Sequence, residues 1–208
     1  MSVGVLGGAF DPPHVGHVAL GRTGLEVFAL ERLLVRVVAD PGHKAVTTPA
    51  EARLELARLA FDELPGTEIA LDPFARTVDS LEALGLAEPV FLVGADEFAA
   101  FLSWKEPDRI LELARLGVAT RPGVDRSRQE AVVAKLGRPE RVTFFQLEPH
   151  EVSSTEIRAR VAAGLPLTGF VRSEVAAAIE RLGLYAHLAL PETGGMLWED
   201  PTERTTPT

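Results

Sequence analysis

Short apolar runs alternate with longer segments of helical period along most of this chain. The runs SVGVLG at 2–7 and LLVRVVA at 33–39 are apolar without strict alternation, which is typical of parallel strands buried on both faces. Between such runs, apolar residues recur at the spacing of an α-helix. The pattern predicts repeated βαβ units, and therefore an α/β protein with a doubly wound, mainly parallel sheet.

The remaining predicted elements continue this alternation. We predict strands at 68–72, 89–95, 116–121 and 142–147, and helices at 15–30, 49–64, 77–86, 125–136, 153–164 and 173–185, with two shorter helices separated by Pro107. The inner face of the first helix is expected to carry Val15, Val18, Ala19 and Leu25. Thr48 can cap the second helix. We expect a single domain over 1–190 with a small helical part at 151–190, followed by a flexible tail over 191–208.

The charge balance limits the possible partners. There are 21 Lys and Arg residues against 30 Asp and Glu, so the net charge of -9 has the wrong sign for binding nucleic acid. An anionic ligand must then meet a local cluster of cations and backbone amides. The chain has no cysteine, no signal-peptide pattern and no apolar run of membrane-spanning length. We therefore expect a cytoplasmic protein with no nucleic-acid or membrane partner.

The first predicted strand runs into GGAFDPPHVGH at 7–17. Paired glycines let the backbone approach a ligand closely, and the prolines pre-set a turn. His14 and His17 then fall on one face of the first helical turn, where free amides and the helix dipole favour an anion. The pattern indicates a phosphate site. Zinc ligation and two ordinary surface histidines are the alternative interpretations.

A second segment, VSSTEIRARV at 152–161, also favours an anion. Ser153 can cap a helix there, and Arg158 lies one turn inside it, where its fork of donors would neutralise a leaving group. A well-capped helix start without further function is the alternative. Together the two segments resemble the signatures of the HxGH nucleotidyltransferases. That resemblance implies a Rossmann-like nucleotidyltransferase fold in which both helix N-termini converge on ATP phosphates.

The segments between the two motifs narrow the resemblance. PGHKAVTTPAEARLELARLA, TVDSLEAL, VGADEFAAFLSW and GVATRPG resemble parts of the bacterial nicotinate mononucleotide adenylyltransferases. The resemblance implies transfer of AMP from ATP to nicotinate mononucleotide in NAD biosynthesis, giving deamido-NAD and pyrophosphate. It implies Mg²⁺ bound mainly through the ATP phosphates, with no metal ligand named on the protein. ATP and nicotinate mononucleotide are the expected partners, and a homo-oligomer remains open.

The resemblance also implies roles for individual residues, with His14, His17 and Arg158 as the catalytic ones. The implied ATP site consists of Gly7, Gly8, Ala9, Phe10, His14, His17, Gly94, Asp96, Ser154, Ile157 and Arg158. The implied site for the second substrate consists of Lys44, Arg76, Thr77, Trp104 and Arg121. For Asp96, a helix N-cap is an equal alternative. Arg76 and Lys105 stand where the family usually has aromatic residues, and their charge favours nicotinate over nicotinamide.

Other functions stay open from the sequence. Within the superfamily, the second substrate could be nicotinamide mononucleotide or phosphopantetheine, although the TVDSL segment and Trp104 argue against phosphopantetheine. A non-catalytic nucleotide-binding regulator would be expected to have lost His14, His17 or Arg158, and all three are present. A tRNA synthetase fragment would need a tRNA-binding surface, which the acidic balance does not suggest.

Overall fold

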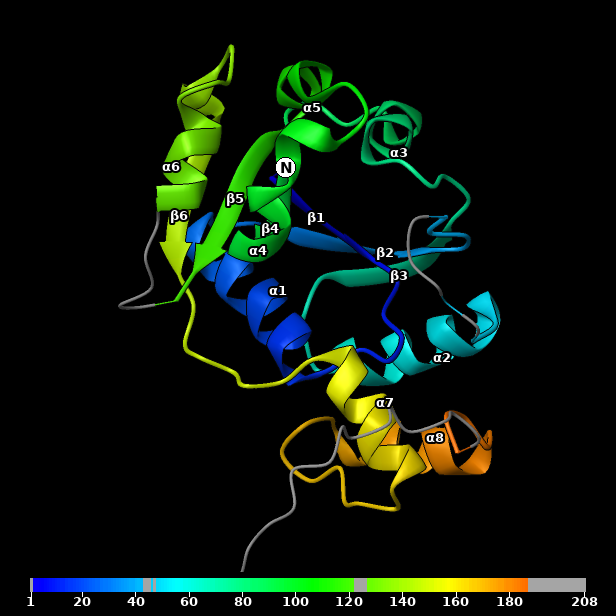
Figure 1. Cartoon of the computed structure of the whole chain (residues 1–208). Helices are drawn as coiled ribbons and strands as arrows, with labels where there is room; N and C mark the ends of the chain where they lie inside the picture. The colour runs from blue at the N-terminus through cyan, green and yellow to red at the C-terminus, as the bar shows by residue number, and fades with distance from the viewer. Residues whose placement is uncertain (1, 43–45, 47, 122–126, 187–208) are drawn as a thin grey trace, which may run out of the picture.

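The computed structural model describes residues 2–42, 46, 48–121 and 127–186, and a six-stranded sheet forms their centre (Figure 1). All neighbouring strands are parallel, in the order β3-β2-β1-β4-β5-β6. The strands are β1 (Val3–Gly8), β2 (Arg32–Val38), β3 (Thr67–Asp72), β4 (Val90–Gly94), β5 (Arg115–Thr120) and β6 (Val142–Gln146). The predicted doubly wound sheet is confirmed, because the strand order reverses between β1 and β4.

Helices connect the strands and cover both faces of the sheet. They are α1 (Val15–Val27), α2 (Ala50–Phe61), α3 (Thr77–Leu84), α4 (Ala95–Ala99), α5 (Pro107–Leu113), α6 (Ser127–Val133), α7 (Ser154–Ala162) and α8 (Ser173–Arg181). Two short 3-10 helices are η1 (Phe101–Ser103) and η2 (Pro139–Arg141). Figure 1 shows α7 and α8 together beyond the edge of the sheet, where α8 packs against α2.

Two hydrophobic clusters fill the two faces. Because successive strand residues point to opposite faces, Leu6 joins one cluster and Val5 the other, and Phe145 and Phe144 divide in the same way. The first cluster lies under α1, α2, α7 and α8, and the second under α3, α4, α5 and α6. The uninterrupted apolar runs of the sequence are explained by this burial on both sides.

Helix α1 lies close to the sheet because glycines form part of its inner face. Its buried residues are Leu20, Gly21 and Gly24. A Cβ on Gly24 would lie 2.4 Å from Cδ1 of Leu92, and one on Gly21 would lie 2.9 Å from Cδ2 of Leu33. The predicted inner face is therefore right in part. Val18 and Leu25 are half-buried and pack against the first cluster, whereas Val15 and Ala19 are half-buried without belonging to it.

Several predicted boundaries also differ from the structure. Helix α1 ends at Val27 rather than at residue 30, because Ala29 adopts a left-handed φ of 48° and turns the chain. Thr48 does not cap α2, whose N-cap is Pro49. The predicted helix at 125–136 ends at Val133 in the structure, and its first two residues lie outside the described part of the chain. Gln129 within it is buried and donates from Nε2 to the carbonyl of Ala95 at 3.2 Å.

Some predictions are not tested by these residues. The tail expected at 191–208 lies outside the described part of the chain, and the expected domain limits stay a prediction.

The predicted cap of α7 is confirmed, because Oγ of Ser153 accepts from the backbone N–H of Glu156 at 3.1 Å. Of the helices that are described, none is both long enough and apolar enough to cross a lipid bilayer.

Replacing Gly24 by alanine should destabilise the fold. The new methyl would overlap Leu92, which is 1% exposed, so we expect a loss of about 1–3 kcal/mol despite the better helix propensity of alanine. Urea unfolding measures this loss. Gly137→Ala is the matched control, because its nearest contact would be an ordinary 3.4 Å from Asp108. Equal stability of the two variants would contradict close packing of α1.

Candidate active site

The candidate site lies at the carboxyl ends of β1 and β4, where the strand order reverses. Parallel sheets open a crevice at such a point, between connections that leave in opposite directions. Gly8 ends β1 and Gly94 ends β4, directly before the N-terminus of α4. The GGAFDPPHVGH loop leaves β1 at this edge and leads into α1, whose N-cap is His14.

The loop before α1 is shaped by Phe10. This residue is 2% exposed and takes a left-handed φ of 49°. Its ring packs edge-on against His17, with centroids 5.1 Å apart, and against Phe61 at 5.8 Å. The Phe10 side chain is therefore a support for the His17 ring and lies in the core. Any contact of Phe10 with ATP would therefore be made by its backbone.

The two histidines of the motif lie against each other. Their rings are stacked, with centroids 3.7 Å apart and planes 24° apart. The backbone N–H of His14 donates to Nδ1 of His17 at 3.2 Å, so a neutral His17 carries its proton on Nε2. Gly16 leaves room for this stack, since a Cβ there would lie 3.2 Å from Nδ1 of His14. The arrangement presents His17 as a hydrogen-bond donor.

His14 is neutral at physiological pH in this structure. Burial and, to a smaller extent, the charge of His150 together lower the pKa of His14 to about 4. Within the described residues, Nδ1 of His14 is buried without a hydrogen-bond partner. A buried imidazole of this kind can donate or accept one hydrogen bond, but it is not a resident cation.

The second motif meets the first across a sequence separation of more than a hundred residues. Ser154 Oγ donates to the carbonyl of Pro12 at 2.8 Å, and Nη1 of Arg158 donates to the carbonyl of Asp11 at 2.7 Å. The start of α7 is thereby fixed to the loop that precedes His14. Ile157 is fully buried in the first cluster, so its side chain anchors α7 in the core.

Arg53 holds the same loop from beneath, although sequence reasoning assigned it no role. Its side chain is 1% exposed. Within the described residues it donates to four backbone carbonyls: Ala9 at 2.7 Å, Val38 at 2.8 Å, Ala39 at 2.7 Å and Thr48 at 3.1 Å. These carbonyls follow or end β1 and β2 and precede α2. An arginine in an amphipathic helix is normally exposed, so no sequence signal marks this one.

A buried pair on the far side of the loop was also missed. Tyr185 donates its hydroxyl to Oδ1 of Asp11 at 2.7 Å, and both side chains are buried. Burial, with the Asp11 carboxylate, raises the pKa of Tyr185 well above its ordinary value, so the hydroxyl stays a donor. The separation of these residues in the sequence gives no hint of the contact.

The residues implied for a second substrate lie on two neighbouring segments. Thr77 begins α3 and Arg76 is its exposed N-cap, while Trp104 follows η1. The Trp104 ring packs edge-on against Phe91 at 6.1 Å and against Phe101 at 5.3 Å. It is half-buried, so part of the ring remains open to a ligand.

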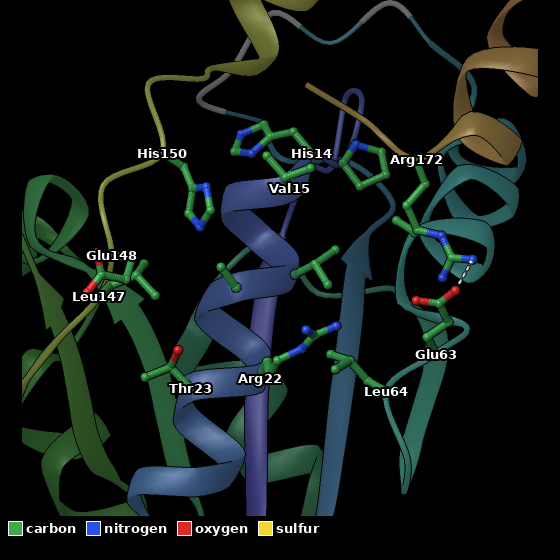
Figure 2. A pocket seen from close by; sticks show the side chains of 14 residues that line it. His14, Val15, Arg22, Thr23, Glu63, Leu64, Leu147, Glu148, His150 and Arg172 are labelled. Carbon is green, nitrogen blue, oxygen red and sulfur yellow. Dashed lines mark ion pairs between the residues drawn. The ribbon is translucent and has the colours of Figure 1, made fainter. Parts of the chain in front are cut away.

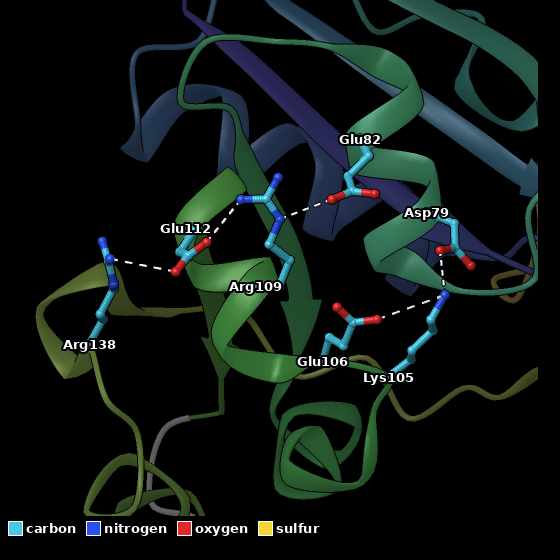
Figure 3. A network of polar contacts seen from close by, with 7 residues as sticks. All are labelled: Asp79, Glu82, Lys105, Glu106, Arg109, Glu112 and Arg138. Atoms are coloured by element: carbon cyan, nitrogen blue, oxygen red, sulfur yellow. Dashed lines mark hydrogen bonds and ion pairs between the residues drawn. The ribbon is translucent and has the colours of Figure 1, made fainter.

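Ion pairs connect these two segments, as Figure 3 shows. Lys105 Nζ lies 2.7 Å from Oδ1 of Asp79, and Nε of Arg109 lies 2.9 Å from Oε1 of Glu82. Both pairs cross from the Trp104 segment and α5 to α3. Lys105 is therefore engaged with α3, and its charge is shared with Asp79.

The other implied site residues have no described contact with the two motif segments. Asp96 is exposed in the first turn of α4, and its alternative role as N-cap is wrong, because Gly94 occupies that position. Arg121 is exposed directly after β5. Lys44 lies outside the described residues. Among the residues that are described, no group of three or more His, Cys, Asp or Glu side chains could hold a metal ion.

A groove adjoins this site but opens on the outer side of α1 (Figure 2). It has a volume of about 470 Å³ and is lined by Val15, Val18 and Ala19, with Arg172 and Glu63 on one side and His150 on the other. His14 lies at its upper end. The edge of the sheet where β1 and β4 end is the better candidate for nucleotide chemistry, because the two motif segments meet there.

Comparison with known proteins finds a matching family model and similar proteins of nearly the same length. A family model described as cytidylyltransferase-like matches residues 5–160. A protein of Rubrobacter xylanophilus is 35% identical over 213 residues, covering 96% of this chain and 99% of its own length. One from Thermus thermophilus is 38% identical over 194 residues, covering 89% of this chain and all of its own length. Both are named "Probable nicotinate-nucleotide adenylyltransferase".

Solved structures share the fold. Plasmodium falciparum nicotinic acid mononucleotide adenylyltransferase complexed with NaAD superposes with a TM-score of 0.70 at 15% identity, covering 89% of this chain and 97% of that one. The same enzyme complexed with APC gives a TM-score of 0.67. The fold is thus that of a nucleotidyltransferase. With the matched family model and near full-length relatives above 30% identity, this chain belongs to the nicotinate-nucleotide adenylyltransferase family of cytidylyltransferase-like proteins.

Proposed function

We propose that this protein transfers AMP from ATP to the 5′-phosphate of nicotinate mononucleotide, in the biosynthesis of NAD. An oxygen of the mononucleotide phosphate attacks the α-phosphorus of ATP. The bond from that phosphorus to the bridging β-oxygen breaks, and deamido-NAD and pyrophosphate are formed. The attacking oxygen is already an anion at neutral pH, so the reaction requires no general base.

The observation that carries this proposal is the joining of the two motif segments. Ser154 and Arg158 bond to the carbonyls of Pro12 and Asp11, immediately before His14. Hydrogen-bond donors of α1 and α7 are thus gathered at one edge of the sheet. Such preorganised donors stabilise the charge that grows on phosphoryl and pyrophosphate oxygens. The names of the curated relatives support the same reaction.

The histidines serve this reaction as neutral donors. His17 accepts at Nδ1 from the His14 backbone N–H, so its neutral form carries the proton on Nε2. His14 is uncharged near pH 7, because burial lowers its pKa to about 4. Since the attacking phosphate oxygen is already an anion, neither histidine is needed to accept a proton from it. We assign them to binding and polarising ATP phosphates.

Magnesium is proposed to arrive with ATP. The first-motif residues offer imidazole and amide donors, and the Asp11 carboxylate accepts from Tyr185, so this site suits phosphate oxygens better than a bare cation. When bound, Mg²⁺ neutralises phosphate charge. The cytoplasmic location and any homo-oligomer remain predictions.

One assay tests the proposed reaction. Purified protein with Mg-ATP is offered nicotinate mononucleotide, nicotinamide mononucleotide or phosphopantetheine, and release of pyrophosphate is followed. We expect the fastest turnover with nicotinate mononucleotide. Faster turnover with nicotinamide mononucleotide would show that the amide is the preferred substrate. No turnover with any of the three would favour a nucleotide-binding regulator.

Removing a phosphate-directed donor should slow the reaction strongly. For His17→Ala and Arg158→Ala we expect kcat to fall about 10²- to 10³-fold, as for other electrostatic sites. Because Arg158 also bonds to the Asp11 carbonyl, its variant needs a matched measurement of melting temperature. Arg160→Ala, on the same helix, is the control. Near-normal turnover in a folded variant would remove the role given to that residue.

His14 should make stability depend on pH in a defined window. Its pKa is about 4 in the folded protein against an ordinary 6.5, so the unfolded chain binds the proton first as pH falls below about 6.5. Folded protein should therefore lose about 2–3 kcal/mol between pH 6.5 and 4 that His14→Gln does not lose. Urea unfolding across this range measures the difference. Identical pH profiles for the two proteins would show that His14 is not held neutral.

The ion pair beside Trp104 should affect the second substrate alone. Asp79→Asn frees Lys105 from α3, and exposed ion pairs contribute little, so KM for nicotinate mononucleotide should rise only about 1.5- to 5-fold. KM for ATP should not change. Glu68→Gln is the matched control, because it breaks the exposed Arg32–Glu68 pair on another part of the sheet. A change confined to ATP would contradict this placement.

A further inference from the structure

Arg36 is a charged residue on a central strand of the sheet. It lies on β2 and is paired with Gly7 of β1 and Ala70 of β3. Val35 and Val37 belong to the cluster under α1 and α2. Since strand side chains alternate, Arg36 points to the opposite face, which α3 covers. The position is near the carboxyl edge, because β1 ends at Gly8 and β2 at Val38.

The neighbours of Arg36 on that face are small. Gly7 has no side chain and Ala70 has only a methyl group, so neither neighbour in this row offers Arg36 a polar partner. The ring of Phe91 borders it, lying 3.6 Å from where a Cβ of Gly7 would be. Trp104 packs on the same Phe91 ring. Arg36 therefore shares a face of the sheet with the proposed pyridine-binding segment.

The carboxylates on this side already have other partners. Glu68 pairs with Arg32 at 2.7 Å, and Asp79 pairs with Lys105 at 2.7 Å. Asp72 accepts from Oγ of Ser80 at 2.5 Å and from the backbone N–H of Phe74 at 3.0 Å. No ion pair between any of these acids and Arg36 is formed within the described residues.

Arg36 itself is half-buried, and its Nε is buried without a hydrogen-bond partner in the described part of the chain. An unsatisfied guanidinium N–H is costly, and native proteins rarely keep one without a reason. A guanidinium matches a carboxylate best, since it can donate two parallel hydrogen bonds to it.

We propose that Arg36 is a specificity-determining residue that binds the carboxylate of the nicotinate ring. Nicotinate and nicotinamide mononucleotides differ only in carboxylate against carboxamide. The cation gains an ion pair with the acid and none with the neutral amide, so it selects the acid. This inference rests on the proposed function. It is distinct from Arg76, which lies exposed at the start of α3.

The test compares acid and amide in one set of variants. For wild type, Arg36→Met, Arg36→Gln and Arg36→Lys, kcat and KM are measured with Mg-ATP and each mononucleotide, and binding of each mononucleotide is measured by calorimetry. Arg32→Met is the matched control, since it removes the arginine on the same face of β2 that Glu68 already occupies. Arg76→Gln tests the other nearby cation. Melting temperatures show that each variant is folded.

We expect Arg36→Met and Arg36→Gln to lower kcat/KM for nicotinate mononucleotide about 10- to 100-fold, mainly through KM. Turnover with nicotinamide mononucleotide and KM for ATP should stay unchanged. Arg36→Lys should be intermediate, and Arg32→Met should match wild type. If Arg36→Met does not fold, the Gln and Lys variants carry the same comparison.

Other outcomes would overturn the inference in distinguishable ways. An unchanged acid-to-amide ratio in folded Arg36 variants, or an equal fall for both substrates, would remove Arg36 from selection while leaving the proposed function intact. Loss of the ratio in Arg76→Gln alone would move the carboxylate site to α3. Wild-type protein that neither binds nor turns over nicotinate mononucleotide would overturn the proposed function and this inference together.

Discussion

The buried guanidinium of Arg53 is the interaction on which the site depends. It gathers carbonyls from the end of β1, the end of β2 and the segment before α2, and each of these points inward because Arg53 supplies a donor for it. Burial lowers the pKa of Arg53, and the charge of Asp11 opposes that effect. A guanidinium keeps its proton even so, and a buried charge fully supplied with acceptors is stable where an unpaired one is not.

The loop held by Arg53 is also held from outside. Tyr185 binds the Asp11 carboxylate, and Arg158 binds the Asp11 backbone carbonyl. Three parts of the chain, from α2, α7 and the segment after α8, thus meet at one turn. This explains why α7 and α8 pack beside α2 rather than forming an independent unit (Figure 1). The same contacts therefore shape the loop before His14 and attach the C-terminal helices to the rest of the domain.

An acidic protein can still bind two anionic substrates because its cations are placed locally. Around the proposed second-substrate site, most charges cancel in pairs that brace α3 against the Trp104 segment. The histidines contribute dipoles and not charge, since His14 is neutral and His17 has a fixed tautomer. The unpaired Nε of Arg36 stands out against this background of matched charges.

Much of the fold could be predicted from the sequence, because apolar runs and turn residues report local preferences directly. All six strands, the order of helices between them, the Ser153 cap and the family resemblance were found in this way. The prediction was incomplete where the burial of a residue differs from what its residue type suggests. On the inner face of α1, the expected Val18 and Leu25 pack against the core, but the periodic pattern does not reveal Gly21 and Gly24, which let the helix lie close to the sheet.

Taken alone, the sequence determined the α/β class, the two motif segments and the residues His14, His17, Ser154 and Arg158 within them, since each depends on local chemistry. Only the tertiary structure decided that Arg53, Tyr185 and Asp11 fix the loop, that Lys105 is bound to Asp79, and that Arg36 lies near the site. These facts depend on contacts between residues far apart in the chain. Such contacts are set by how strands and helices pack, which no local pattern records.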